Sequence, residues 1–523
     1  MARTVAKKLS VKLPKAKIPH LPKTATTYED AQLFNFGGGL NTKYSNNEIG
    51  DNESPDLLNV NFDQNGAVVK RRGFIPLNSQ HIDSNAIMSL IPFEKSDGSR
   101  YLVACSGTSV YSWDWNALAW TAIKTGLSGN GVKFTGSVYN DVLYLWNGVD
   151  TPMTWDGSTF GALSYPPGSC AYAVVSGNRM YAAGDPLARS RLYYSTADDP
   201  TDWNATSTEG GFIDIDTNDG DIITGLALLL DSVVIFKRKS IWVLKGADPA
   251  YYTLIAAHAG VGCVSHWTIQ NVLNNLVFLS EDGVYAFNGT GVTLLSDKIG
   301  PSLIGTGGHT GLNWKDIGNA EATVYQWKYW LSVPTGLSST NDALYLYHYL
   351  SPAWTVYDLK RASFAVMRPE LSTDAPTLYG GDAGDGFVYE EATTDADNSA
   401  PIDAYFLTKN FDFSYPEHYK RFKRFFAYAL SDASSGTLTV TATLDFSLSS
   451  TVLTLNLGGS GSKWGSFTWG QATWGGQSNP ISQTKGINGQ ARYIQFRVEN
   501  NASGEPFTFL GIAIQVLVKT RLQ

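Results

Sequence analysis

Residues 34–74 read FNFGGGLNTKYSNNEIGDNESPDLLNVNFDQNGAVVKRRGF. Near the end of this stretch, Asn65 and Gly66 lie between two runs of alternating character, residues 58–62 and 67–71. Asn-Gly readily adopts the positive φ angles of a type I′ turn, which joins adjacent antiparallel strands. We therefore predict a β-hairpin here, and this hairpin is the strongest local indication that the chain is built from strands.

The composition extends this indication to the whole chain. Among 523 residues there are 51 Gly, 27 Tyr and 15 Trp, while charged residues make up only 16%. A disordered chain would be poor in aromatics and rich in charge. Abundant aromatics with many Gly, Asn and Asp turns favour short strands, so the sequence predicts an all-β protein.

Charge and hydropathy exclude several classes of function. The formal net charge is −8, whereas a protein that grips DNA phosphates usually carries a basic surface. No stretch reaches 18 apolar residues, so no membrane span is expected, and the N-terminus lacks the apolar core of a secretory signal. Cys105, Cys170 and Cys263 are widely spaced and odd in number, which favours buried free thiols over a disulfide scaffold.

Residues 80–399 contain a loose repeat in which a short strand carries an aromatic, turns at Gly or Asn, and returns. Paired short strands that recur every 40–50 residues or so are typical of propeller blades. We predict a β-propeller over this range, with the number of blades left open and an array of β-sandwiches as the alternative. The segments that carry the repeat are 110–114, 143–148, 284–289, 344–347 and 387–390.

From residue 400 onward the pattern changes to clean alternation with period two, as in 437–444 and 510–517. Strands of this kind bury one face, so we predict an antiparallel β-sandwich platform domain over 400–523, to which residues 34–79 contribute their hairpin. The basic run 420–424 is interpreted as a solvated strand face, with a docking surface as the minor alternative.

Residues 1–33 form a basic extended arm. Lysines at 7, 8, 12, 15, 17 and 23 alternate with Val, Leu and Ile, and prolines at 14, 19 and 22 forbid a long helix. Two interpretations are open: a solvated tail, or a strand-like arm that orders against a neighbouring subunit.

A Trp-Gly repeat at residues 464–475 is a second local feature. We favour internal packing of these tryptophans over an exposed interface, because large aromatics are mostly buried.

Motifs that carry chemistry are missing. The sequence has no HExxH, CxxC, GxSxG or Walker motif, and residues 214–221 match a calcium loop only in part, with Gly225 where a bidentate Glu is needed. An Asx-rich turn is the favoured interpretation of 214–221. We assign no catalytic, cofactor-binding or metal-ligating residue, and expect neither a cofactor nor an enzyme.

Several segments, in their order, resemble the tail nozzle family of short-tailed double-stranded DNA phages, also called tail tubular or head-to-tail DNA-stabilisation proteins. Besides the hairpin above, these segments are SGNRMYAAG (176–184), RLYYS (191–195), PTDWN (200–204), DGDIITGL (219–226), VVIF (233–236), SIW (240–242), GVGC (260–263) and NLVFLS (275–280). The resemblance covers residues 34–300 well and the C-terminal part loosely.

This resemblance implies a structural virion protein of the phage tail. It implies a homohexameric ring that closes the tail channel, retains packaged DNA and conducts double-stranded DNA during ejection without binding it specifically. The implied partners are a portal-side adaptor ring and tail fibre or needle proteins. The alternatives are a distal tail or hub protein of a long-tailed phage, and a carbohydrate-binding or glycoside-cleaving propeller.

Overall fold

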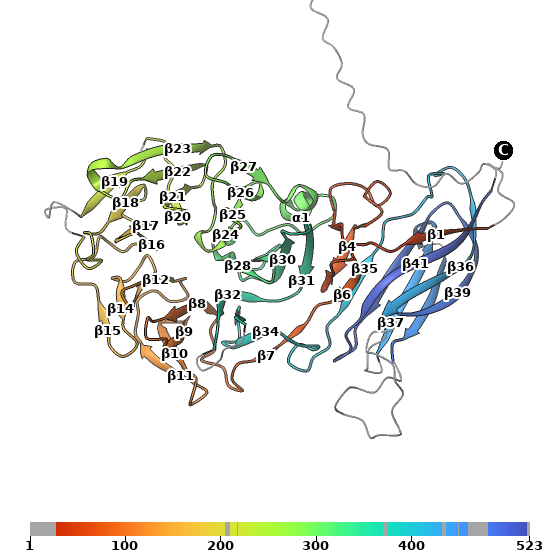
Figure 1. Ribbon diagram of the computed structural model, residues 1–523, viewed down its shortest axis with the longest axis horizontal. Coiled ribbons are helices and arrows are strands. Elements are labelled where there is room, and N and C mark those ends of the chain that lie inside the picture. Colours follow the sequence, from red (N-terminus) through yellow and green to blue (C-terminus); the bar gives the residue numbers. More distant parts are fainter. Residues whose placement is uncertain are drawn as a thin grey trace, which may run out of the picture.

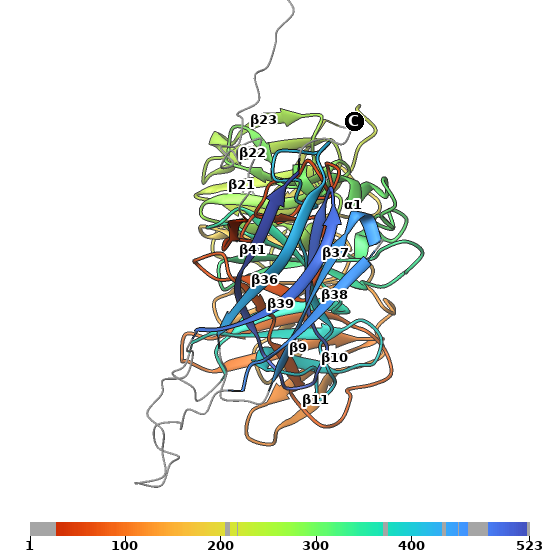
Figure 2. The ribbon, with the colours of Figure 1, turned by 90° about the vertical axis from the view of Figure 1, so that its right-hand side faces the viewer.

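The computed structural model describes residues 28–203, 210–216, 218–369, 375–430, 436–447, 449–458 and 480–519. Within these residues the protein is all-β, with a ring of small sheets beside a two-sheet platform (Figure 1, Figure 2). The predicted fold class is confirmed. The few helices are single turns or little more: η1 (Pro249–Tyr251), η2 (His266–Thr268), η3 (Asp297–Ile299), α1 (Gly300–Ile304), η4 (Ile317–Asn319) and η5 (Asp445–Ser447).

The described residues form seven four-stranded antiparallel sheets, which are the blades of a propeller. In blades 1 to 6 the chain runs from the inner strand outward, and the inner strands of all seven blades pack side by side around the ring. The strands of blades 1 to 4 are β8 (Ile87–Glu94), β9 (Arg100–Ser106), β10 (Ser109–Asp114), β11 (Ala119–Lys124), β12 (Thr135–Tyr139), β13 (Val142–Trp146), β14 (Met153–Trp155), β15 (Phe160–Ala162), β16 (Tyr172–Ser176), β17 (Arg179–Ala183), β18 (Arg191–Tyr194), β19 (Gly211–Asp214), β20 (Ile223–Leu229), β21 (Ser232–Lys237), β22 (Ser240–Lys245) and β23 (Thr253–Ala259).

Blade 7 closes the ring by taking its outermost strand from the start of the chain. Strand β7 pairs with β34, so the two ends of the propeller are joined by hydrogen bonds. The sequence assigned residues 34–79 to the platform, and the structure instead places 73–76 in the propeller. The strands of blades 5 to 7 are β24 (Gln270–Val272), β25 (Asn275–Ser280), β26 (Gly283–Phe287), β27 (Val292–Leu294), β28 (Glu321–Tyr325), β29 (Lys328–Val333), β30 (Ala343–His348), β31 (Ala353–Tyr357), β32 (Arg361–Met367), β33 (Thr377–Asp382), β34 (Val388–Thr394) and β7 (Gly73–Pro76).

The alternation of side chains in each blade explains why the repeat is rich in aromatics. In β13, Leu143 and Leu145 pack into a core shared with blade 1, whereas Tyr144 and Trp146 pack into a core shared with blade 3. A strand between two neighbouring blades buries both of its faces, so it reads as a nearly continuous apolar run. The repeat in the sequence therefore records the spacing between blades.

The platform consists of two sheets packed face to face, one of six strands and one of five. Phe406 and Phe496 from the five-stranded sheet and Phe425 from the six-stranded sheet share one core. The platform strands are β1 (Glu29–Leu33), β4 (Asp56–Leu58), β5 (Val60–Phe62), β6 (Val68–Lys70), β35 (Ala404–Leu407), β36 (Lys420–Leu430), β37 (Thr437–Leu444), β38 (Ser449–Asn456), β39 (Pro480–Ala491), β40 (Ile494–Asn500) and β41 (Thr508–Val518), and a short parallel pair, β2 (Gly39–Leu40) and β3 (Glu53–Ser54), lies apart from both sheets.

The predicted hairpin is present, but its turn differs from the expected type. Val60 pairs with Lys70 and Phe62 with Val68, which leaves five residues in the connection. Gly66 has a φ of 82°, whereas Asn65 does not have a positive φ, and the Gly66 N–H donates to the Asp63 carbonyl at 3.1 Å. The Asp63 carboxylate accepts the Asn65 and Ala67 N–H groups, both at 2.8 Å. This side-chain capping favours a type I turn followed by a left-handed Gly over the predicted type I′ turn.

The basic run at 420–424 is only partly a solvated face. Lys420 is buried, and its ammonium donates to the carbonyls of Tyr415 at 2.5 Å and Arg492 at 2.7 Å. Burial lowers the pKa of Lys420 to about 8. Phe422 is also buried, whereas Arg421 and Lys423 are exposed, as period-two alternation requires.

Two features named from the sequence fall outside the described residues: the Trp-Gly repeat at 464–475 and positions 1–27 of the arm. The three cysteines are described, and each is buried and free. Burial raises the pKa of all three thiols above the ordinary value.

Candidate functional site

Side chains from non-neighbouring blades meet at one end of the propeller axis. Lys133 precedes the inner strand of blade 2, and its ammonium donates to the carboxylate of Glu321, the first residue of the inner strand of blade 6. The same ammonium donates to the Ala362 carbonyl of blade 7 at 2.6 Å. The other Glu321 oxygen accepts the Phe364 N–H at 2.9 Å. Since blades 2 and 6 lie across the ring from each other, this buried ion pair spans the axis.

The short helix η2 (His266–Thr268) lies at the same end of the axis. Together with Lys133 and Glu321 it forms a group of side chains that is called the plug below. The Trp267 indole N–H donates to the Phe134 carbonyl of blade 2 at 3.2 Å, and the Lys133 ammonium lies 5.5 Å from the Trp267 ring. The His266 ring lies 4.6 Å from the ring of Tyr172 in blade 3, and its Nδ1 accepts the Leu226 N–H of blade 4 at 3.3 Å. Blade 5 thus connects to three other blades through two consecutive residues, His266 and Trp267.

Burial sets the protonation of the plug. It raises the pKa of Glu321 and lowers the pKa of Lys133, while their mutual attraction opposes both shifts. Burial also lowers the pKa of His266 to about 3, so that this ring is neutral near pH 7 and its Nδ1 can accept a hydrogen bond. The end of the propeller that carries Lys133, Glu321 and η2 is called the plugged face below.

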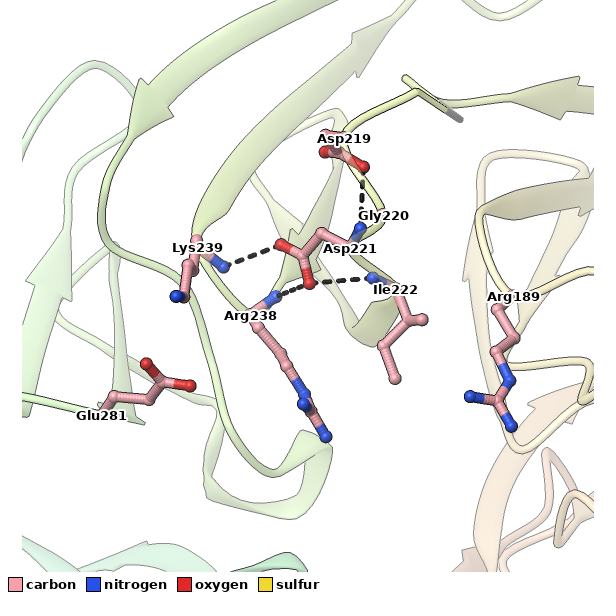
Figure 3. A pocket seen from close by; sticks show the side chains of 8 residues that line it. All are labelled: Arg189, Asp219, Gly220, Asp221, Ile222, Arg238, Lys239 and Glu281. Atoms are coloured by element: carbon pink, nitrogen blue, oxygen red, sulfur yellow. Dashed lines mark hydrogen bonds between the residues drawn. The ribbon is translucent and has the colours of Figure 1, made fainter.

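A pocket of about 360 Å³ opens between blades 3, 4 and 5, on turns that also belong to the plugged face (Figure 3). These are the connections from one blade to the next and the turns between second and third strands. The pocket is lined by Arg189, Asp219, Gly220, Asp221, Ile222, Arg238, Lys239 and Glu281.

The two aspartates of this pocket are engaged within the protein. The Asp221 carboxylate accepts the N–H groups of Ile222 at 2.8 Å, Lys239 at 2.9 Å and Arg238 at 3.3 Å, which holds the turn between β21 and β22 (Figure 3). Asp219 accepts the Asp221 N–H at 2.9 Å and the ammonium of the buried Lys237 at 2.5 Å. These carboxylates therefore organise an Asx-type turn, as the sequence favoured for 214–221.

The basic side chains of the pocket face solvent. Arg189, Arg238 and Lys239 are exposed, and none forms an ion pair with a carboxylate of the described residues. Burial opposes ionisation of Asp219, but the hydrogen bonds from Lys237 and the Asp221 N–H outweigh it and lower its pKa. The pocket thus presents three cationic groups, with Glu281 as the remaining free carboxylate at its rim.

A second hollow of about 570 Å³ continues from the first, because Arg238 and Glu281 line both. It adds Trp314 and Lys315 from the connection between blades 5 and 6. Guanidinium and ammonium groups bind phosphate, sulfate and carboxylate oxygens, and an indole offers a flat apolar surface beside them. The groove from Arg189 to Lys315 can therefore hold an extended anionic ligand.

Sequence reasoning did not find this groove. Its cations come from three separate turns, with Arg189 about 50 residues before the adjacent Arg238 and Lys239 and with Lys315 about 75 residues after them, and no local motif joins them. Asp219, Gly220 and Asp221 of this groove belong to the segment 214–221, whose pattern indicated an Asx-rich turn and no anion site. Within the described residues no group of three or more His, Cys, Asp or Glu side chains is arranged to hold a metal ion. Of the helices that the structure describes, none has the length and apolarity needed to cross a bilayer.

Comparison with known proteins assigns no family to this chain. No family model matches the chain, and no curated relative matches it. Among solved structures, YCF48 from Cyanidioschyzon merolae and U3-55K each cover 98% of their own chain and 61% of this one, both at a TM-score of 0.38 and at identities of 10% and 11%. The extracellular domain of BT4673 from B. thetaiotaomicron gives a TM-score of 0.41 at 12% identity, covering 78% of this chain and 62% of that one. Similarity this distant carries no conclusion about function.

Proposed function

We propose that this protein is a structural component of a phage tail, a nozzle or hub ring that closes the tail channel, retains packaged DNA and conducts it during ejection. The sequence resemblance described above motivates the proposal. The structural observation that supports it best is the continuous core between propeller and platform. A single cluster of buried side chains contains Leu331 and Trp354 of the propeller together with Phe406 and Ile512 of the platform.

A ring component must keep its shape while a genome under pressure is held behind it. A propeller joined to its neighbour through one packed core moves as one body, because close-packed interiors deform little. The platform is suited to contact neighbouring copies and a portal-side adaptor, and the propeller projects from it (Figure 1). Fibre or needle proteins are further partners under this proposal.

The plugged axis has a direct consequence for the DNA path. A propeller whose centre is bridged by Lys133, Glu321 and Trp267 offers no open bore through its own axis at that face. In a hexameric ring the DNA would therefore pass between copies. The mild acidity of the chain suits a wall that DNA slides past, since like charges do not bind.

Electron microscopy of purified protein with its tail neighbours, and of virions, tests the proposal. We expect a six-fold ring at the tail end, with the propellers around a central channel. Isolated monomers that are absent from virions would overturn it. A monodisperse ring of another order, located at the tail end, would support the tail assignment and correct the hexamer.

A carbohydrate-binding propeller is the second candidate, and the groove from Arg189 to Lys315 is the observation that favours it. Trp314 beside cationic groups resembles the surroundings that an acidic sugar requires. Binding of a charged-glycan array by the purified chain, lost in Arg238→Gln and retained in Arg421→Gln on the platform, would support this function.

A further inference from the structure

The propeller face opposite the plug displays large apolar side chains at the tips of its turns. This face carries the turns between first and second strands and between third and fourth strands. In blades 4, 5 and 6 the turn between the first and second strands carries Leu230, Leu273 and Trp327, respectively. These side chains are 75%, 63% and 60% exposed. These three residues are called the apolar turns below.

The backbone at the apolar turns makes their residue types unexpected. Leu273 and Asn274 have φ angles of 49° and 59°, Gln326 and Trp327 have 46° and 63°, and Leu230 has 54°. Bulky side chains disfavour the left-handed region, whereas Asn, Asp and Gly adopt it readily. Blade 2 uses Asn140 and Asp141 in the same position, at 46° and 62°. Three successive blades thus keep a strained, exposed apolar residue where the chain elsewhere uses the residues that suit the turn.

The apolar turns belong to a wider surface. Trp327 packs against Tyr349, whose ring centre lies 6.2 Å away, and Leu350 beside it is exposed. Near blade 4, Leu230 lines a pocket of about 400 Å³ between blades 3 and 4. Backbone strain at exposed positions is typical of ligand-binding and switch regions. Exposed apolar residues gathered on one face point to a protein partner.

The charges on this face indicate which partner fits. Exposed Asp198, Asp231 and Asp248 lie in the turns of blades 3 and 4, and Lys245 is the nearby base. A complementary segment would be basic and would carry apolar side chains. The first 27 residues of this chain hold seven of its 39 Lys and Arg, none of its 47 Asp and Glu, and apolar residues at 9, 11 and 13 with lysines at 8 and 12. In an extended segment such residues project on alternate sides.

The direction of the chain favours an arm from another copy. Strand β1 lies in the platform on the side away from the propeller, and the chain then approaches the propeller, where β2 packs against β31 (Figure 1). Glu29 at the start of β1 pairs with Val516, whereas the opposite end of β41 pairs with β6, so residues 1–27 join the described chain at the end of the platform away from the propeller. Docking on its own propeller would require the arm to reverse and cross the platform, whereas a neighbouring copy requires no reversal.

We propose that residues 1–27 of one copy bind the apolar turns of a second copy. Lysines of the arm would face the carboxylates of blades 3 and 4, and its Val and Leu side chains would cover Leu230, Leu273 and Trp327. This contact is independent of the nozzle proposal, because it requires only self-association.

Sedimentation of the full-length chain over a range of concentrations tests the contact. We expect the parent protein to associate in a concentration-dependent way. Combining Leu230→Asn, Leu273→Asn and Trp327→Gly should lower the association constant about thirtyfold or more, as loss of interface anchors predicts. The same variant should unfold at a higher temperature, because these residues suit a positive φ. Leu337→Asn is the matched control: Leu337 is fully exposed on the plugged face, and its loss should leave association unchanged.

The arm itself is tested by changing its lysines at 7, 8, 12, 15, 17 and 23 to Gln in the full chain. Association should weaken and lose its dependence on salt, and a free peptide of residues 1–27 should dissociate the parent protein. Association that survives either the turn variant or the arm variant would overturn the proposal. A chain that stays monomeric at every concentration would also overturn the proposal. If the arm variant altered the quenching of Trp327 in such a monomer, the arm would dock on its own propeller.

Discussion

Arg71 shows how one side chain joins the two parts of the molecule. Its guanidinium donates to both carboxylate oxygens of Asp397, at 2.6 and 2.8 Å, and to the Asn59 side-chain oxygen at 2.8 Å. It also lies 5.4 Å from the centre of the Tyr357 ring. Asn59 has a φ of 55°, and its N–H donates to the Val356 carbonyl of blade 6 at 2.9 Å. Only a planar guanidinium can satisfy this set of acceptors at once.

We predict that Arg71→Lys lowers the free energy of unfolding by about 2 kcal/mol or more, since Lys cannot reproduce the paired hydrogen bonds of a buried guanidinium. Arg72→Lys is the matched control, because Arg72 is exposed and its guanidinium donates, among the described residues, to the Thr393 carbonyl alone. That change should stay within about 0.5 kcal/mol of the parent. Urea unfolding compares the variants, and equal effects of the two would contradict the role given to Arg71.

Two half-buried histidines make stability depend on pH. Burial lowers the pKa of His266 to about 3, and burial with the nearby Lys328 charge lowers that of His348 to about 3. An unfolded histidine titrates near 6.5, so below about pH 6.5 the unfolded chain binds protons that the folded chain does not. We expect each histidine to remove up to about 1.4 kcal/mol of stability per pH unit between pH 6.5 and 4.

Urea unfolding at pH 7, 6 and 5 measures this slope. His348→Gln should make the slope shallower, and combining it with His266→Gln should make it shallower again. His81→Gln removes a histidine from an exposed position and serves as the control. If the slope of the double variant equals that of the parent, the two rings do not carry the acid sensitivity.

At the scale of elements, the closure of blade 7 depends on the short strand β7. Gly73 begins this strand, and a Cβ there would lie 2.1 Å from the Ala396 carbonyl oxygen. Since the obstacle is backbone, the strand would have to shift, and β7 holds β34 through only three paired positions. The ring of blades therefore depends on a glycine outside the repeat.

We predict that Gly73→Ala destabilises the protein by about 1–3 kcal/mol, the usual cost of forcing an atom into a packed site. Faster hydrogen exchange of the β34 amides should accompany the loss. Gly291→Ala is the control, since a Cβ there meets nothing within 4 Å and should change stability by less than about 0.5 kcal/mol. Exchange that is unchanged at β34 would show that blade 7 does not need β7.

The elements that could be read from the sequence are those with strong local patterns. The hairpin at 58–71, the strand pairs of the propeller and the period-two strands after residue 400 all have a pattern shorter than 15 residues. The pairing of β7 with β34 joins positions more than 300 residues apart, and the Arg189–Lys315 groove gathers side chains from several blades. No local pattern encodes either. The hairpin turn was mistaken because the Asp63 carboxylate competes with the expected backbone geometry.

At the scale of the whole molecule, the propeller and platform should unfold together. Phe36 lies in the segment between β1 and β2 and packs against Phe406 and Phe509 of the platform, at 5.3 and 5.7 Å between ring centres. These side chains belong to the same buried cluster as Tyr329 and Leu331 of blade 6. A core that is continuous across two parts couples their stabilities, so neither part has an independent unfolding equilibrium.

Phe36→Ala tests this coupling, because twelve of the 15 tryptophans lie in residues 80–399 and their fluorescence reports on the propeller. Loss of a buried Phe costs about 3–5 kcal/mol. If the core is shared, the change should shift the fluorescence transition and the circular dichroism transition by the same amount, and calorimetry of the parent should show one peak. Two calorimetric peaks, or a fluorescence midpoint that Phe36→Ala leaves in place, would mean that the propeller is stable without the platform. A shared transition would instead mean that a force applied to the platform reaches the plugged axis through packed side chains, which is the mechanical property that a tail closure requires.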